Sequence, residues 1–292
     1  MRFPPITATG SDRRNIRLHS TSVIGLLLTA GAALVTAFVL APAALLEPTF
    51  GAYNNDATRQ DALGRALADY WRSGTAAFPA DLTTLVDYWF QWHAIKVVIS
   101  TASVVVFALL ATALWRRYLR FRPWLAVAAT AATVSTVLAT GVLVLNIQAT
   151  AVPLVALLPL LPGRTTDGQL AQTVSEMREA LAAPASPHAG SPALTALLGE
   201  VERYHWVTVA VAATLMVAAA LASAHVWKRR VGGDLSARVK FMHSTLGVIT
   251  ALTACLLLLM AVASALSALD PATWLLGVIG AGPTATAGSV PS

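Results

Sequence analysis

Residues 124–163 are WLAVAATAATVSTVLATGVLVLNIQATAVPLVALLPLLPG, a run without one charged side chain. A helix of about 20 apolar residues crosses the hydrocarbon core of a bilayer, which is about 30 Å thick. In soluble domains roughly a quarter of the residues are charged, so a run of this length is not expected there. It predicts a membrane-spanning helix that leaves the bilayer near Asn146 and Gln148.

The end of this run, residues 151–162, contains three prolines. About 12 residues are too few to span a bilayer, and proline disfavours a continuous helix. These residues therefore predict an interfacial segment or a shallow re-entrant one, and the sequence leaves both alternatives open.

Four further uncharged runs have the length of a membrane span. They cover residues 21–46, 97–115, 206–227 and 244–269. The whole chain of 292 residues is 56% hydrophobic and only 12% charged, which excludes both a soluble globule and a disordered chain. Because helices satisfy their own backbone hydrogen bonds in lipid, we predict an all-α polytopic membrane helix bundle with five transmembrane helices.

The charged residues divide between two sets of connecting segments. Residues 1–20, 116–123 and 228–243 together carry thirteen basic and two acidic residues, a formal charge of +11, whereas the remaining segments carry −5. Short loops rich in Lys and Arg stay in the cytoplasm. We therefore predict a multi-pass plasma-membrane protein with a cytoplasmic N-terminus and an extracytoplasmic C-terminus. The basic residues indicate orientation, with membrane lipids as partners and no nucleic acid.

The first span has a second interpretation. Arg13-Arg14 precedes the apolar run, and Ala41-Pro42-Ala43 resembles a signal-peptide cleavage site, so the segment could be a twin-arginine signal. The run is long for a cleaved signal, and Asp12 precedes the arginine pair. We expect an uncleaved first span.

An internal duplication appears when the chain is shifted by 112 residues. Trp92-His93 then falls on Tyr204-His205, and residues 115–117 (WRR) fall on residues 227–229 (WKR). Matching positions with these uncommon residues indicate a duplicated two-helix unit followed by an unpaired fifth helix. The predicted divisions are a cytoplasmic arm (1–20), a first repeat (21–117), a second repeat (118–230), a fifth transmembrane helix (231–270) and an external flexible tail (271–292).

Each repeat also predicts helices outside the membrane. Residues 56–71 and 166–182 place apolar side chains on one face at helical spacing. Pro79 and Pro192 begin helical patterns that continue to Trp115 and Trp227, which is longer than a bilayer requires. We therefore expect an extracytoplasmic helical cap.

Two histidines, His93 and His205, are equivalent under the duplication. Paired histidines on neighbouring spans hold haem in membrane cytochromes, so these two are candidate cofactor-binding residues, although no cofactor is firmly indicated. The alternative is that both rings serve as interfacial anchors or helix–helix contacts. No motif predicts a catalytic residue, and the single cysteine, Cys255, argues against a structural zinc site.

The aromatic residues of the outer segments form the other candidate site. Those chosen as a ligand or partner surface are Tyr70, Trp71, Trp89, Trp92 and Trp206. Tryptophan and tyrosine favour the membrane interface and are frequent in binding sites. We expect a non-enzymatic protein that binds a lipid, an apolar ligand or a partner protein, including a second copy of the chain, at the outer leaflet. The alternatives are a haem or redox protein, and a passive channel or transporter accessory subunit.

Several short stretches resemble a known group of proteins. Residues 42–55 (PAALLEPTFGAYNN), Asp87-Tyr88-Trp89 and residues 146–149 (NIQA) are similar to uncharacterised multi-pass membrane proteins of actinobacteria, often labelled twin-arginine signal proteins. The resemblance implies a membrane location and no particular activity. A fainter similarity to anthrone-oxygenase-like membrane proteins carries no shared catalytic motif.

Overall fold

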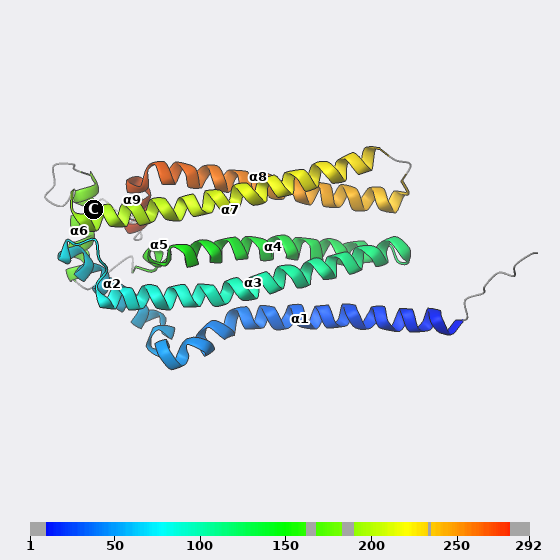
Figure 1. Ribbon diagram of the computed structural model, residues 1–292, viewed down its shortest axis with the longest axis horizontal. Coiled ribbons are helices and arrows are strands. Elements are labelled where there is room, and N and C mark those ends of the chain that lie inside the picture. Colours follow the sequence, from blue (N-terminus) through cyan, green and yellow to red (C-terminus); the bar gives the residue numbers. More distant parts are fainter. Residues whose placement is uncertain (1–9, 162–167, 183–189, 233–234, 281–292) are drawn as a thin grey trace, which may run out of the picture. The chain divides into compact units, whose positions relative to one another are not determined.

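The computed structural model describes residues 10–161, 168–182, 190–232 and 235–280, and within these ranges the chain is helical, with no β-strand. The long helices are α1 (Gly10–Phe50), α3 (Ala80–Arg120), α4 (Leu125–Ala151), α7 (Pro192–Val231) and α8 (Ala237–Leu269) (Figure 1). The short ones are η1 (Gly51–Asn54), α2 (Asp56–Ser73), α5 (Pro153–Leu157), η2 (Leu158–Leu160), α6 (Gly168–Ala182) and α9 (Pro271–Gly280).

Five of the helices in the described residues are long and apolar enough to cross a membrane, as predicted. They are Val23–Asn54, α3, α4, α7 and α8, and each contains a window of mean hydropathy between 1.9 and 2.5. Their apolar side chains largely face outward: Val98 is 70% exposed and Val127 77%. Outward-facing apolar side chains are stable in lipid and unfavourable in water, so the fold is that of a multi-pass membrane protein.

The chain forms two compact units. Unit 1 contains Met1–Val39, Ile99–Val142 and Ala222–Thr250, and unit 2 contains Leu40–Val98, Leu143–Leu221 and Ala251–Ser292. Each unit takes part of both predicted repeats, because α3 and α7 each contribute their N-terminal part to unit 2 and their C-terminal part to unit 1.

Unit 1 is held by contacts among its long helices. Trp115 of α3 is 5% exposed, and its Nε1 donates a hydrogen bond to Thr133 Oγ1 of α4 at 3.1 Å. On α1, a Cβ at Gly31 would lie 3.0 Å from the Phe107 ring of α3, so this small residue permits a close approach. Polar contacts to α8 include the Ser223 hydroxyl, which donates to the Gly247 carbonyl at 3.1 Å.

Unit 2 contains a well-packed core built from the short helices and the first turns of α3 and α7. Its fully buried side chains include Leu63, Leu67 and Tyr70 of α2, Leu82 and Leu85 of α3, Leu157 and Leu158, Met177 of α6, Leu197 of α7 and Leu275 of α9. In Figure 1, α2 and α6 lie side by side, and α9 contacts α6. The predicted amphipathic helices therefore bury their apolar faces against one another.

The boundaries of these helices follow from local residues. Asn55 caps α2, since its side-chain oxygen accepts a hydrogen bond from the Thr58 amide at 3.1 Å, and Gly74 ends the helix at φ 62°. Asp270 caps α9 in the same way through Thr273, and these hydrogen bonds from Thr273 lower the pKa of the Asp270 carboxyl. The starts of α3 and α7, at Ala80 and Pro192, are separated by the 112 residues of the predicted duplication.

Two segments lie deeper in the protein than the sequence indicated. The predicted interfacial or re-entrant segment contains α5 and η2, whose Leu154, Leu157 and Leu158 are buried in the core of unit 2. Pro271–Gly280, predicted to begin an external flexible tail with an interfacial contact at residues 274–279, is helix α9, because Leu275 and Ile279 fill the same core. The rest of that predicted tail, residues 281–292, lies outside the described residues, as does the start of the helix predicted at 166–182.

Candidate functional site

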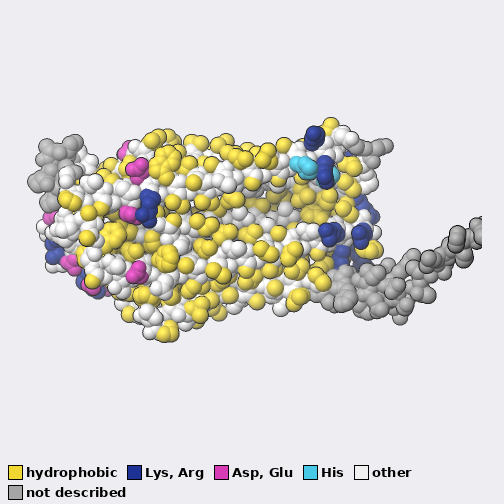
Figure 2. Space-filling view, viewed as in Figure 1, with side chains coloured by type: hydrophobic (Ala, Val, Ile, Leu, Met, Phe, Trp, Pro, Cys, Tyr) yellow, Lys and Arg dark blue, Asp and Glu magenta, His cyan; other side chains and the backbone are white. Residues whose placement is uncertain are grey.

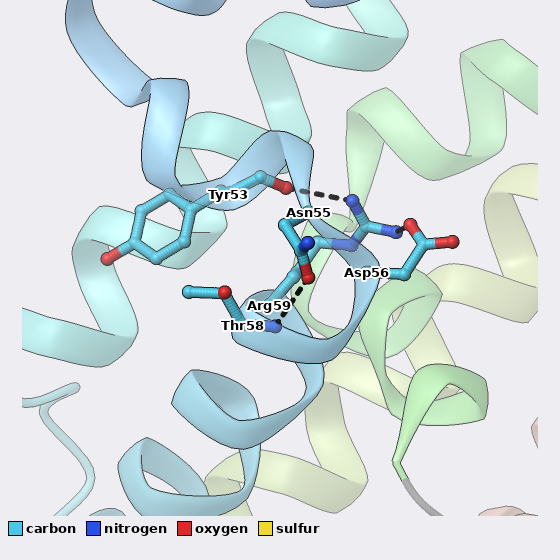
Figure 3. Close-up of polar contacts among 5 residues, drawn as sticks. All are labelled: Tyr53, Asn55, Asp56, Thr58 and Arg59. Atoms are coloured by element: carbon cyan, nitrogen blue, oxygen red, sulfur yellow. Dashed lines mark hydrogen bonds and ion pairs between the residues drawn. The ribbon is translucent and has the colours of Figure 1, made fainter.

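An arginine lies almost buried at the start of α2. The side chain of Arg59 is only 10% exposed, whereas that of its ion-pair partner Asp56 is 82% exposed. Arg59 Nη1 also donates a hydrogen bond to the Tyr53 carbonyl at 2.9 Å. Figure 3 shows the guanidinium reaching between the Tyr53 carbonyl oxygen and the Asp56 carboxylate, close to the Asn55 cap.

An aromatic cluster on α3 contacts this guanidinium through Trp89. The Arg59 Cζ atom lies 5.5 Å from the centre of the Trp89 ring, a cation–π contact. The ring of Tyr88 lies 5.5 Å from Tyr53 and 5.7 Å from Trp92, and Tyr88 is close enough to Arg59 to interact with it electrostatically. We call this group the Arg59 site; it consists of Tyr53, Arg59, Tyr88, Trp89, Trp92 and His93.

His93 extends the Arg59 site toward α4. Its ring packs edge-on against Trp89 at 4.8 Å, and its Nδ1 lies 2.8 Å from Asn146 Oδ1. Because a side-chain amide oxygen only accepts, Nδ1 donates, and Nε2 of the neutral ring is then an acceptor. One turn further along α3, the Lys96 ammonium lies 5.2 Å from the centre of the Trp92 ring.

Several buried polar atoms of this region make no hydrogen bond to any described residue. They are Arg59 Nε, Tyr88 Oη, Trp89 Nε1, His93 Nε2 and, in neighbouring η1, Asn54 Oδ1. Buried polar groups in native proteins are nearly always satisfied, because each unsatisfied one costs about 1–3 kcal/mol. Arg59 Nε and Trp89 Nε1 can only donate, so these two atoms suit a group with acceptor oxygens, whereas Asn54 Oδ1 and His93 Nε2 are acceptors.

The second predicted histidine lies in a different group of residues. His205 of α7 is 6% exposed, and its ring packs against Tyr204 and, at 5.0 Å, against Trp274 of α9. Neither of its ring nitrogens has a hydrogen-bond partner among the described residues. The contacts of His93 and those of His205 involve different residues, and the described part of the chain contains no cluster of three or more His, Cys, Asp or Glu residues that could hold a metal ion.

The predicted aromatic surface divides into buried and exposed members. Tyr70 is fully buried and donates a hydrogen bond to the Ala193 carbonyl at 3.0 Å, and Trp71 is 3% exposed and donates to Glu176 at 3.0 Å. Both are packing residues that join α2 to its neighbours. Trp89 and Trp92 are half-buried in the Arg59 site, and Trp206 is 44% exposed on α7.

Sequence reasoning did not single out Arg59. The signal for Arg59 was available: it precedes Leu63 and Leu67 at intervals of four residues, so it shares the apolar face of α2. A charged residue on an apolar face must find partners when the helix packs.

Comparisons with protein-family models, with curated proteins and with solved structures found no match to the chain.

Proposed function

We propose that this multi-pass membrane protein binds the phosphate-bearing headgroup of an anionic lipid at the Arg59 site. The observation that supports the proposal is a nearly buried arginine whose Nε has no hydrogen-bond partner among the described residues, next to a Trp89 ring whose Nε1 also has none. A phosphate offers several acceptor oxygens to Arg59 Nε, Trp89 Nε1 and the Tyr88 hydroxyl. Its charge would also neutralise an arginine whose partner carboxylate faces solvent.

The proposed location of the site is the outer leaflet of the plasma membrane. All described Asp and Glu side chains belong to unit 2, whereas the last turns of α3 and α7, which lie in unit 1, carry Arg117, Arg120, Lys228, Arg229 and Arg230; Lys and Arg side chains are coloured dark blue in Figure 2. By the positive-inside rule this distribution supports cytoplasmic loops in unit 1 and an extracytoplasmic position for the short helices of unit 2. Tryptophans such as Trp89 and Trp92 suit the headgroup level.

We also propose that the predicted two-helix unit is duplicated within the chain. Besides the equal spacing of the starts of α3 and α7, the paired positions Leu82 and Leu194, and Leu85 and Leu197, are buried in one core. The Arg59 site is not duplicated in detail, because Arg59 pairs with Ala171 under the shift of 112 residues.

Replacing Arg59 with alanine is expected to weaken the binding of phosphatidylglycerol at least about tenfold, since hydrogen bonds to charged groups contribute about 1.5–3 kcal/mol. Native mass spectrometry of the full chain in detergent, titrated with phosphatidylglycerol, measures this loss. Diacylglycerol, which has no phosphate, should be retained at least tenfold more weakly by the unaltered protein.

Arg65→Ala is the matched control, because Arg65 lies on the same helix and is exposed. It should leave retention of phosphatidylglycerol unchanged. Tyr88→Phe removes one hydroxyl while keeping the buried ring, so it should weaken binding without unfolding the protein. The proposal fails if Arg59→Ala and Arg65→Ala retain the lipid equally, or if diacylglycerol binds as well as phosphatidylglycerol.

Haem binding is a second proposal, favoured by one observation: Nε2 of His93 is buried without a partner, while Nδ1 is oriented by Asn146. An imidazole oriented in this way is typical of a histidine ligand to iron. If the proposal is correct, protein purified from cells supplied with haem absorbs in the Soret region, and His93→Ala removes the band. A colourless protein after haem supplementation would contradict it.

A further inference from the structure

A cavity of about 300 Å³ lies within unit 1, apart from the Arg59 site, which belongs to unit 2. Its walls come from the middle of three predicted spans. The main lining residues are Val35 and Phe38 of α1, Ser100 and Phe107 of α3, and Ser135 and Ala139 of α4. Most of these side chains are apolar, so the cavity suits an apolar molecule.

One polar group in this wall has no partner. Ser100 is 2% exposed, and its hydroxyl makes no hydrogen bond to any described residue. Ser103, one turn along α3 in the same wall, instead donates to the Ile99 carbonyl at 2.8 Å, which is the usual way for a serine in a helix to satisfy its hydroxyl. An unsatisfied buried hydroxyl is costly, so the wall favours an occupant that supplies an oxygen to Ser100.

We propose that this cavity binds a small apolar alcohol or ketone, with its oxygen hydrogen-bonded to Ser100. A cavity of about 150 Å³ holds benzene, so this one has room for about a dozen non-hydrogen atoms. Entry from the bilayer is consistent with two lining residues, Val39 and Leu138, each 65% exposed. An acyl chain of a lipid could also fill the space, but its methylenes would leave the Ser100 hydroxyl unsatisfied.

Photolabelling tests the proposal with two matched probes. One is octan-1-ol bearing a diazirine on its chain, and the other is the corresponding alkane without the hydroxyl. In the full-length protein in lipid nanodiscs, we expect the alcohol to label residues of the cavity wall and the alkane to label them about three- to tenfold less, the effect of one net hydrogen bond. Ser100→Ala should reduce labelling by the alcohol to the level of the alkane.

Filling the cavity provides an independent test. Ala139→Phe or, as a milder variant, Ser135→Leu should abolish labelling of the wall by the alcohol, whereas Val127→Phe, on the exposed face of the same helix, should not. The proposal is overturned if both probes label the wall equally in the unaltered protein, since an acyl-chain groove would give that result. It is also overturned if Ser100→Ala leaves labelling by the alcohol unchanged.

Discussion

Replacing Trp71 with alanine lowers the free energy of unfolding by about 3–5 kcal/mol, the usual effect of removing a large buried aromatic side chain. Trp71 is 3% exposed in the core of unit 2, and its Nε1 donates to Glu176, so the substitution removes packing and also one link between α2 and α6. Titration of the purified protein with sodium dodecyl sulfate in mixed micelles, followed by circular dichroism, measures the change.

Trp206→Ala is the control for this prediction. Trp206 also donates its Nε1 to a glutamate, Glu202, at 3.3 Å, but its side chain is 44% exposed. Surface substitutions usually change stability by less than about 0.5 kcal/mol, so Trp206→Ala should have little effect. Equal losses of unfolding free energy for the two variants would contradict the prediction, because they would show that burial does not determine how much each tryptophan contributes to stability.

Replacing Gly247 with alanine destabilises the contact between α7 and α8 by about 1–3 kcal/mol, the usual cost of overpacking. A Cβ at this position would lie 2.8 Å from Trp227 Nε1 and 3.0 Å from its Cε2. An indole is rigid, so the ring or the helices must move. The Ser223 hydrogen bond to the Gly247 carbonyl would then lengthen. The same detergent titration measures the loss.

Gly141→Ala should not destabilise the protein. Nothing lies within 4 Å of a Cβ at Gly141 in α4, so alanine adds no clash there. Alanine favours a helix interior over glycine by about 1 kcal/mol, and the variant should be as stable as the original protein or slightly more so. A loss of stability at Gly141 comparable to that at Gly247 would contradict the proposed close approach of α8 to Trp227.

The membrane-spanning helices could be predicted from the sequence because their signal is compositional. A run such as residues 244–269 needs no knowledge of its neighbours to indicate a helix in lipid. The long helices that start at Ala80 and Pro192 were also predictable, since helical periodicity continues outside the apolar run. Pro79 and Pro192 mark the starts of these helices locally, and the capping residue Asn55 marks the start of α2.

The helix α9 was not predictable in the same way. Pro271–Gly280 is a short apolar segment near a stretch rich in glycine, proline and threonine, and a short isolated helix is marginal in water. It is stable here because Leu275 and Ile279 enter a core formed by residues from distant parts of the chain. Burial of that kind depends on which helices meet, and no local pattern contains this information.

The candidate sites show the same contrast. The sequence predicted an aromatic binding surface and a candidate histidine pair, His93 and His205. It did not distinguish Tyr70 and Trp71 from Trp89 and Trp92. Tertiary packing separates them, since the first two are buried with hydrogen-bond partners, whereas Trp89 contacts Arg59 and Trp92 packs against Tyr88.

By itself, the sequence determined that this is a helical membrane protein with five spans, because length, hydropathy and charge act on each segment separately. Only the tertiary structure decided that Arg59 is nearly buried against the Trp89 ring and that Ser100, without a hydrogen-bond partner among the described residues, lines a cavity. The physical reason is that burial and hydrogen bonding of a side chain depend on residues far away in the chain, which approach only when the helices pack.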